Sequence, residues 1–380
     1  MQTLNINHEL ISWALERSGR SADSLVRYFP KLTQWENGEA QPTIKQLEAF
    51  AKKTWTPLGY FFLPEPPQEK LPIPDFRTVS DRHVGGISPN LIDTLQTMQR
   101  RQTWMREYLV DRGHNPLPFI GSANLRVPPI SVAQQIRQVI GTGDGWASNH
   151  DTWSDALRHL REAIEEAGIL VVINGVVGND THRKLDTEEF RGFVLIDKYA
   201  PLIFVNGSDA KSAQMFTLAH ELAHLWVGES ALFNLPNLVP SEFAIEQYCN
   251  KVAAELLVPE KEFKNYWPRA TQDVEPFQTI ARYFKVSPIV AARRALDLGF
   301  IQQAEFLSFF REYQEDERRK TARSKGGNFY LTQNTRLGKR FVRAVALAAK
   351  EGRLLYRDAY RLTDLHGATF DKYVKALGVS

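Results

Sequence analysis

The sequence predicts an α+β fold, with a few strands followed by a long series of helices. Residues 169–173 form a short β-branched run, which is typical of a buried strand. The apolar runs 193–196 and 202–205 flank a short polar stretch that ends at Pro201, and this pattern predicts a β-hairpin. Helical patterns dominate from about residue 212 onward. Because strands do not alternate with helices along the chain, a doubly wound sheet is not expected.

Length and composition are those of a globular protein with more than one domain. At 380 residues the chain is too long for one ordinary core, and two or three domains are expected. Hydrophobic residues make up 43% and charged residues 24%, which is ordinary for globular domains.

The sequence lacks the features that mark membrane or secreted proteins. No uninterrupted apolar stretch approaches about 20 residues, so neither a membrane-spanning helix nor a membrane partner is expected. The first residues do not have the pattern of a secretory signal. Cys249 is the single cysteine, which excludes an intrachain disulfide. These features predict a cytoplasmic protein.

The N-terminal part, residues 1–63, is expected to form a small all-α domain. Ile11 and Ala14 have helical spacing, Ser21 has the character of an N-cap for a second helix, and Thr43 starts a longer helix. Residues 64–87 are rich in proline and are expected to form a stiff extended linker.

The main domain is expected at residues 88–300, and residues 301–380 are expected to form a helical, basic C-terminal region. Residues 311–363 carry fourteen Lys or Arg against six Asp or Glu, a net charge of +8, whereas residues 1–70 have a net charge of zero. A polyanion such as DNA would therefore be attracted to the C-terminal region first. The predicted helices lie at 89–110, 131–140, 151–167, 212–227, 242–257, 274–284, 287–298, 302–320 and 337–350.

One short motif carries recognisable chemistry. His220 and His224 are four residues apart in a predicted helix, so both side chains can point at one metal ion. Glu221 is offset by one residue and can reach a water molecule held by that metal, which makes it the candidate general base. The neighbouring residues are apolar, and a buried pair of histidines beside a buried glutamate is costly unless a metal organises it. The spacing therefore predicts one zinc ion per chain, for which manganese or another divalent ion could substitute.

A catalytic zinc site needs a third protein ligand. No histidine lies between His224 and His366, so the nearby candidates are acidic: Glu229, Glu242, Glu246 and Glu255. Glu246 is preferred because Asn250 lies one helical turn later, where its side chain could orient a ligating histidine. Glu242 is the alternative, and Glu255 is expected to lie on the polar side of its helix or to cap nearby groups.

Two motifs together resemble the ImmA/IrrE family of metallo-endopeptidases. They are the segment 216–224, which holds the two histidines, and the segment 246–259, which ends at Pro259. The resemblance covers roughly residues 165–300 and implies a zincin-like core in which His220, His224 and Glu246 bind zinc and Glu221 is the general base. It also implies a regulatory role, in which a repressor-type protein is cut in response to stress. Some similar fusions resemble components of toxin–antitoxin modules.

Within the predicted domain of residues 1–63, residues 20–63 resemble the XRE type of helix-turn-helix domain, on the stretch 32–43 and on Leu47 and Ala51. Trp35-Glu36-Asn37-Gly38 matches the end of the recognition helix in that family. The recognition helix is expected to be about one turn short, with Lys31, Thr33 and Gln34 as the candidate base readers. The zero net charge of residues 1–70 favours the alternative, a domain that keeps the fold without binding DNA, or one that docks a protein partner. A second helix-turn-helix rhythm at 277–300 is expected to support the core.

Two functions remain open from the sequence. The first is an active zinc endopeptidase that cleaves a repressor or antitoxin, and so controls a stress response, a mobile element or a toxin–antitoxin module with a cognate toxin. The second is a DNA-binding transcriptional regulator or antitoxin that uses the protease fold as a sensor or scaffold. The presence of all candidate ligands and of Glu221 favours the first.

The predicted hairpin at 193–206 suggests how a peptide substrate would bind. Peptides often bind by adding a strand to a free sheet edge. One strand of this hairpin is therefore expected to be a free edge beside His220 and Glu221. The alternative is that both strands are internal to the sheet.

Overall fold

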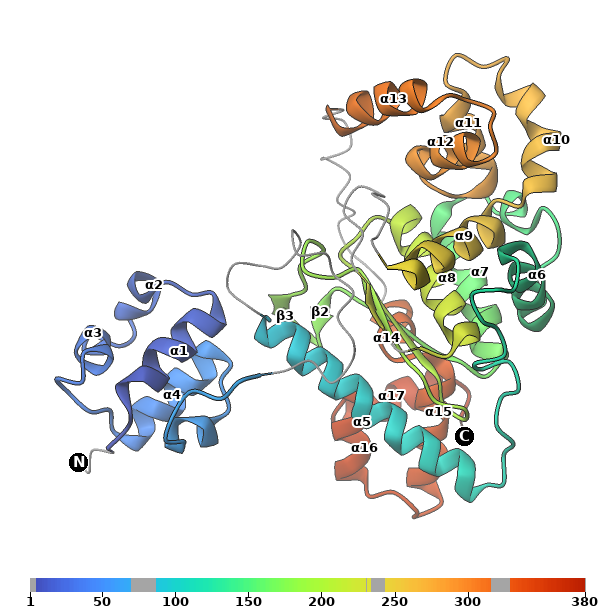
Figure 1. Ribbon diagram of the computed structural model, residues 1–380. Helices are drawn as coiled ribbons and strands as arrows, with labels where there is room; N and C mark the ends of the chain where they lie inside the picture. The colour runs from blue at the N-terminus through green and yellow to red at the C-terminus, as the bar shows by residue number, and fades with distance from the viewer. Residues whose placement is uncertain (1–4, 70–86, 230, 234–242, 316–328, 380) are drawn as a thin grey trace. The chain divides into compact units, whose positions relative to one another are not determined.

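The computed structural model describes residues 5–69, 87–229, 231–233, 243–315 and 329–379 (Figure 1). It confirms a mixed α+β protein with a small sheet and many helices. The chain divides into two compact units, and the division between them falls between Gln96 and Thr97, inside helix α5 (Pro89–Asp111).

The first unit contains a small all-α bundle. Its helices are α1 (His8–Ser18), α2 (Ala22–Val26), α3 (Leu32–Glu36), α4 (Ile44–Thr54) and the 3-10 helix η1 (Leu58–Phe62). Ser21 caps α2 by accepting from the backbone N–H of Ser24, and Thr43 forms a capping box with Gln46 at the start of α4, so the two predicted helix starts are confirmed. Leu10, Trp35 and Phe50 are among the side chains buried in its core.

The second unit is built on a four-stranded sheet with the order β1-β5-β4-β6. Strands β1 (Leu170–Asn174) and β5 (Leu202–Asn206) are parallel, whereas β4 (Gly192–Leu195) pairs antiparallel with β5 and with β6 (Ala231–Phe233). The predicted strand and the predicted hairpin are therefore confirmed. Strands β2 (Val176–Val177) and β3 (Asp180–Lys184) form a separate two-stranded ladder.

The expectation of a free edge on the hairpin is wrong. Strand β5 lies between β1 and β4, and β4 lies between β5 and β6, so both hairpin strands are internal. The physical reason is that β4 and β5 are apolar on both faces, as the buried neighbours Phe193 and Val194 illustrate. A strand buried on both faces belongs inside a sheet. Within the described residues, the outer strands are β1 and β6.

Helices surround the sheet and share one core with it. Helix α8 (Lys211–Val227) packs on β4 and β5, and helix α9 (Ala244–Leu257) packs on α8. The side chains Ile280, Phe284 and Val290, from the segment with helix-turn-helix rhythm, lie in this same core, which supports their structural role. The remaining helices are α6 (Pro129–Ile140), η3 (Trp146–Asn149), α7 (Trp153–Glu166), α10 (Glu260–Ala270), α11 (Pro276–Phe284), α12 (Pro288–Asp297) and α13 (Gln303–Glu315).

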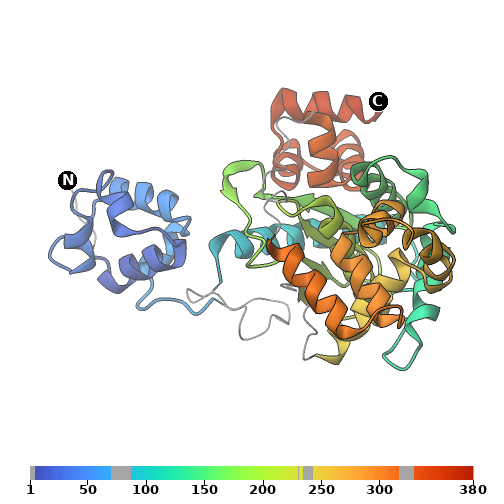
Figure 2. The same cartoon turned by 90° about the horizontal axis from the view of Figure 1, so that it is seen from above.

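The C-terminal helices form one group, red in Figure 2, and pack on the rest of this unit. They are α14 (Phe329–Leu337), α15 (Lys339–Lys350), α16 (Tyr356–Thr363) and α17 (Gly367–Ala376). The buried Arg101 of α5 donates to the backbone oxygens of Leu362 and Arg336 and pairs with Asp364. Helix α14 lies along β1, and an added Cβ at Gly338 would come within 3.2 Å of the backbone oxygen of Val171.

Among the helices of the described residues, none combines the length and the apolar character needed to cross a bilayer.

Candidate metal centre

Helix α8 carries two histidines in the middle of the protein core. Every residue from Gln214 to Trp226 is buried, because strands β4 and β5 lie against one side of the helix and α9 against another. His220, Glu221 and His224 are each 0% exposed. Polar side chains at this depth are costly unless they are paired with each other or with a ligand.

Glu246 of α9 completes a compact group with the two histidines. Its Oε2 lies 3.0 Å from Nε2 of His220, and its Oε1 lies 3.2 Å from Nε2 of His224. The two Nε2 atoms are 3.0 Å apart. Tetrahedral zinc with bonds of roughly 2.0–2.1 Å places its ligand atoms about 3.3 Å from one another. The two imidazole nitrogens and the carboxylate group are therefore spaced like the ligands of a single small metal ion.

The protonation states of this group fit a divalent metal. Burial lowers the pKa of His220, so its imidazole is neutral near pH 7. Burial alone would raise the pKa of Glu246, but the neighbouring imidazoles of His220 and His224 outweigh it and bring the pKa to about 2. Imidazole nitrogens and an ionised carboxylate oxygen are a usual donor set for zinc in enzymes.

Asn250 fixes the orientation of one imidazole. Nδ1 of His220 lies 3.0 Å from Oδ1 of Asn250, one helical turn beyond Glu246 on α9. Since the amide oxygen only accepts, the Nδ1–H of His220 donates to it, and Nε2 is the nitrogen that faces His224 and Glu246. A hydrogen bond of this kind is what sets which nitrogen of a histidine can bind a metal.

Glu221 of α8 lies beside this group. Both oxygens of its buried carboxyl group lack a hydrogen-bond partner among the described residues. Burial raises the pKa of Glu221 well above its ordinary range, and the charge of Glu246 adds to that shift. Perturbed, unpartnered carboxyl groups in a core are a frequent sign of a reactive site.

Gly192, at the start of β4, gives Glu221 its space, and the sequence analysis missed it. An added Cβ at this position would lie 2.6 Å from Cγ2 of Thr217, 2.9 Å from the backbone oxygen of Phe204 and 3.2 Å from Oε1 of Glu221. The start of this internal strand therefore passes so close to the candidate base that a side chain at position 192 would crowd it. A glycine at the start of an apolar strand is the available signal, because it often marks a close approach of another group.

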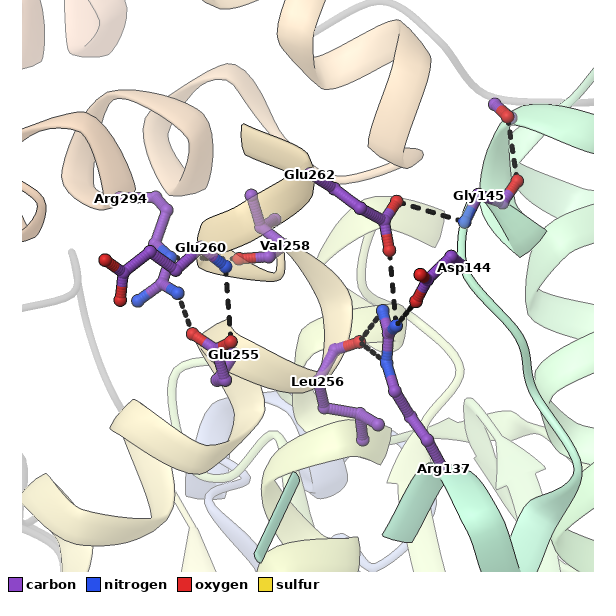
Figure 3. A network of polar contacts seen from close by, with 10 residues as sticks. Arg137, Asp144, Gly145, Glu255, Leu256, Val258, Glu260, Glu262 and Arg294 are labelled. Carbon is purple, nitrogen blue, oxygen red and sulfur yellow. Dashed lines mark hydrogen bonds and ion pairs between the residues drawn. The ribbon is translucent and has the colours of Figure 1, made fainter. Parts of the chain in front are cut away.

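The other acidic candidates are placed elsewhere. Glu255, in the last turn of α9, accepts from the backbone N–H of Glu260 at the start of α10 and pairs with Arg294, so it caps a nearby group as expected (Figure 3). Glu229 is exposed just beyond the end of α8, and Glu242 lies outside the described residues.

A polar network holds the far end of α9 in place. Arg137 of α6 donates to the backbone oxygen of Leu256 and pairs with Glu262 of α10, while Arg294 of α12 donates to the backbone oxygen of Val258 (Figure 3). Three helices thus fix the C-terminal end of α9.

The residues of the first unit that are candidates for contacting DNA bases are all on the surface. Lys31, Thr33 and Gln34 are exposed, while Leu32 and Trp35 of the same short helix are buried. Helix α3 has five residues, as short as the sequence suggests. DNA binding by this helix stays a prediction.

Replacing Gly192 with Ala is expected to destabilise the second unit by about 1–3 kcal/mol, because the added methyl group must displace Thr217, Glu221 or the paired strand. The free energy of unfolding measured in urea gives this difference. Gly143→Ala is the matched control, since an added Cβ there meets no atom within 4 Å. If both variants unfold at the same urea concentration as the parent, the close approach at Gly192 has no energetic importance.

Two family models match parts of this chain. Residues 164–296 match peptidase family M78, described as an IrrE N-terminal-like domain, and residues 337–376 match a domain of unknown function, DUF8813. Neither the curated proteins nor the solved structures contain a match. The first range includes His220, Glu221, His224 and Glu246, and the match supports the predicted resemblance to ImmA/IrrE-type proteases. It suggests a metallopeptidase and implies a divalent metal, whereas the helix-turn-helix segment lies outside it.

Proposed function

We propose that this protein is a zinc-dependent endopeptidase that hydrolyses a regulatory protein of the repressor or antitoxin type. The observation that carries the proposal is the buried group of His220, His224 and Glu246, in which the two Nε2 atoms are 3.0 Å apart and each lies 3.0–3.2 Å from an oxygen of Glu246. Beside it lies the carboxyl group of Glu221, which has no hydrogen-bond partner among the described residues. The match of residues 164–296 to a peptidase family supports it.

In this proposal His220, His224 and Glu246 hold the metal, and Asn250 keeps the first imidazole in the ligating orientation. Zinc, when bound, lowers the pKa of water and polarises a carbonyl group. The positive charge of a bound metal would favour the ionised form of Glu221, which would then accept a proton from the attacking water at its carboxylate oxygen. It then delivers that proton to the departing amine, which completes the hydrolysis.

The regulatory nature of the substrate is proposed from the likeness to ImmA/IrrE proteases. The N-terminal unit would bring the enzyme to its substrate, either by docking the repressor or by binding the same DNA. The cleaved protein would control a stress response, a mobile element or a cognate toxin.

The substrate can be tested with the products of the neighbouring genes. Incubation of the zinc-loaded protein with an adjacent repressor or antitoxin is expected to give one defined pair of fragments, visible by mass spectrometry. A chelator should stop the reaction and added zinc should restore it, because the three ligands act only through the metal. Continued formation of fragments after complete metal removal would contradict the proposal. So would a lack of cleavage when the metal-loaded protein is incubated with the products of the neighbouring genes.

Asn250→Ala is expected to weaken zinc affinity about 10–100-fold, because the ligating tautomer of His220 loses its partner. Competition with a chromophoric chelator measures the affinity. Lys251→Ala is the matched control on the next, exposed position of α9 and is expected to bind zinc like the parent. Equal affinities for the two variants would mean that Asn250 does not position the histidine.

A second candidate function is DNA-binding regulation with the protease fold as a sensor. The exposure of Lys31, Thr33 and Gln34 on one short helix favours it. Zero net charge over residues 1–70 argues against tight binding, since phosphate contacts supply most non-specific affinity. The two functions are separable, because a variant without a general base would still bind an operator.

A further inference from the structure

Strand β6 occupies the border of the sheet beside the candidate metal centre. It pairs antiparallel with β4, and its residue Phe233 lies opposite Gly192. Gly192 is the residue at which an added Cβ would come within 3.2 Å of Oε1 of Glu221. Adjacent strands lie about 4.8 Å apart, and β6 also lies against α8. A strand of the chain itself therefore runs past the candidate base, at the place where a free edge was expected.

The metal centre beside this strand is closed. His220, Glu221 and His224 are 0% exposed, and Glu246 is 3% exposed. A catalytic zinc ion keeps one position open for water and substrate, and a polypeptide must reach that position before it can be hydrolysed. Part of the surroundings must therefore move before the proposed reaction can occur.

Strand β4 needs a partner on the side where β6 lies. Every residue of β4 is buried, and a strand of this kind belongs inside a sheet. If β6 left, β4 would present a row of unpaired backbone donors and acceptors beside Glu221. An extended segment of another polypeptide could pair with that row as β6 does, because strand addition relies mainly on main-chain hydrogen bonds. Strand β6 and such a segment would compete for one edge.

Strand β6 also has the fewest pairing contacts in this sheet. Among the described residues it pairs with β4 alone, through the three residues Ala231–Phe233. Strands β4 and β5 pair through four residues each, and β1 and β5 through five. Because ladder hydrogen bonds increase with the number of paired residues, β6 has the fewest bonds to lose. It can leave with less loss of pairing than either of its neighbours in the sheet.

We propose that β6 is an internal competitor of the substrate, which pairs with β4, keeps the metal centre closed and must be displaced before a peptide can bind there. This inference rests on the proposed endopeptidase function. It assigns the binding of substrate to the backbone of residues 192–194, so the substrate must offer an extended segment. A compact domain without such a segment would not displace β6.

Hydrogen exchange of the unmodified, full-length protein tests the displacement without substrate and without metal. In an antiparallel ladder, alternate N–H groups of β4 bond to β6 and to β5. Those that bond to β6 are expected to exchange at least about a hundredfold faster than those that bond to β5, because β6 opens locally while β5 stays paired on both sides. Residue-resolved NMR measures both classes. Equal protection of the two classes would show that β6 is a permanent fourth strand and would overturn the proposal.

A reversible cross-link tests the closure. Val194 and Ala231 are cross-strand partners, and the Cα atoms of such partners lie about 4.5–5.5 Å apart, within the range that a disulfide spans. Val194→Cys combined with Ala231→Cys is expected, when oxidised, to release zinc to the chelator pyridylazoresorcinol at least about tenfold more slowly than when reduced with a phosphine. Hydrolysis of a cleavable regulatory protein should be lost on oxidation and should return on reduction.

Ala231→Cys alone is the matched control, because it carries the same new thiol without a partner for it. Oxidation is expected to leave its zinc release and its hydrolysis unchanged. The proposal is overturned if the cross-linked protein, with its disulfide verified by mass spectrometry, releases zinc or cleaves protein as fast as the reduced form. If no form cleaves a regulatory protein while hydrogen exchange and zinc release respond as expected, the endopeptidase proposal fails and the closure by β6 stands.

Discussion

Replacing Glu221 with Gln is expected to remove peptide-bond hydrolysis, with a loss of at least about a hundredfold in turnover. The amide has nearly the same shape as the carboxyl group but cannot accept the proton of the attacking water. The described residues offer Glu221 no hydrogen-bond partner that the change would break, so the fold and the metal content should be preserved. Turnover of a cleavable regulatory protein measures the loss of hydrolysis. Metal analysis and circular dichroism show whether the metal content and the fold are preserved.

Glu166→Gln provides the control for this experiment. It makes the same chemical change at an exposed position at the end of α7 and is expected to leave turnover unaltered. If Glu221→Gln retains turnover within a few fold of the parent while metal stays bound, the general base lies elsewhere.

Replacing His220 with Ala is expected to reduce the bound metal from about one zinc per chain to a small fraction of that value. The substitution removes one of three ligands and also the partner of Asn250, so the two remaining ligands cannot hold zinc at ordinary concentrations. Metal content of the purified, folded protein by mass spectrometry gives the ratio directly.

His182→Ala serves as the matched substitution, because this histidine is exposed on β3. It should retain the full complement of zinc. A His220→Ala protein with undiminished zinc would show that the metal binds at other residues, whatever its effect on activity.

Much of the fold around the candidate metal centre could be predicted from local sequence. The helices α8 and α9 have strong apolar patterns, and the four-residue spacing of His220 and His224 fixes their common face. The N-caps at Ser21 and Thr43 are local signals as well, and both were predicted. These features depend on residues within one or two turns of one another, which is the range over which sequence patterns are informative.

Features that depend on distant pairing were harder to predict. Strand β6 has three residues, and its partner β4 precedes it by a whole helix, so no local pattern indicates it. The hairpin edge was predicted wrongly for the same reason, although the continuous apolar run at 193–196 was a signal for an internal strand. Helix α10 carries many charges and an internal Pro268, which hides its periodicity. Helix α14 owes its position to contacts with β1.

The position of α14 along β1 has a consequence for solubility. A strand at the border of a sheet offers a row of backbone donors and acceptors with which another chain can pair. Strand β1 is a short apolar segment, Leu170–Asn174, of the kind that assembles readily when it is uncovered. Helix α14 and the close approach of Gly338 to Val171 cover this border. By covering the edge of β1, the C-terminal helices thus oppose self-association through this strand. A chain that ends after Glu315 would leave the edge uncovered.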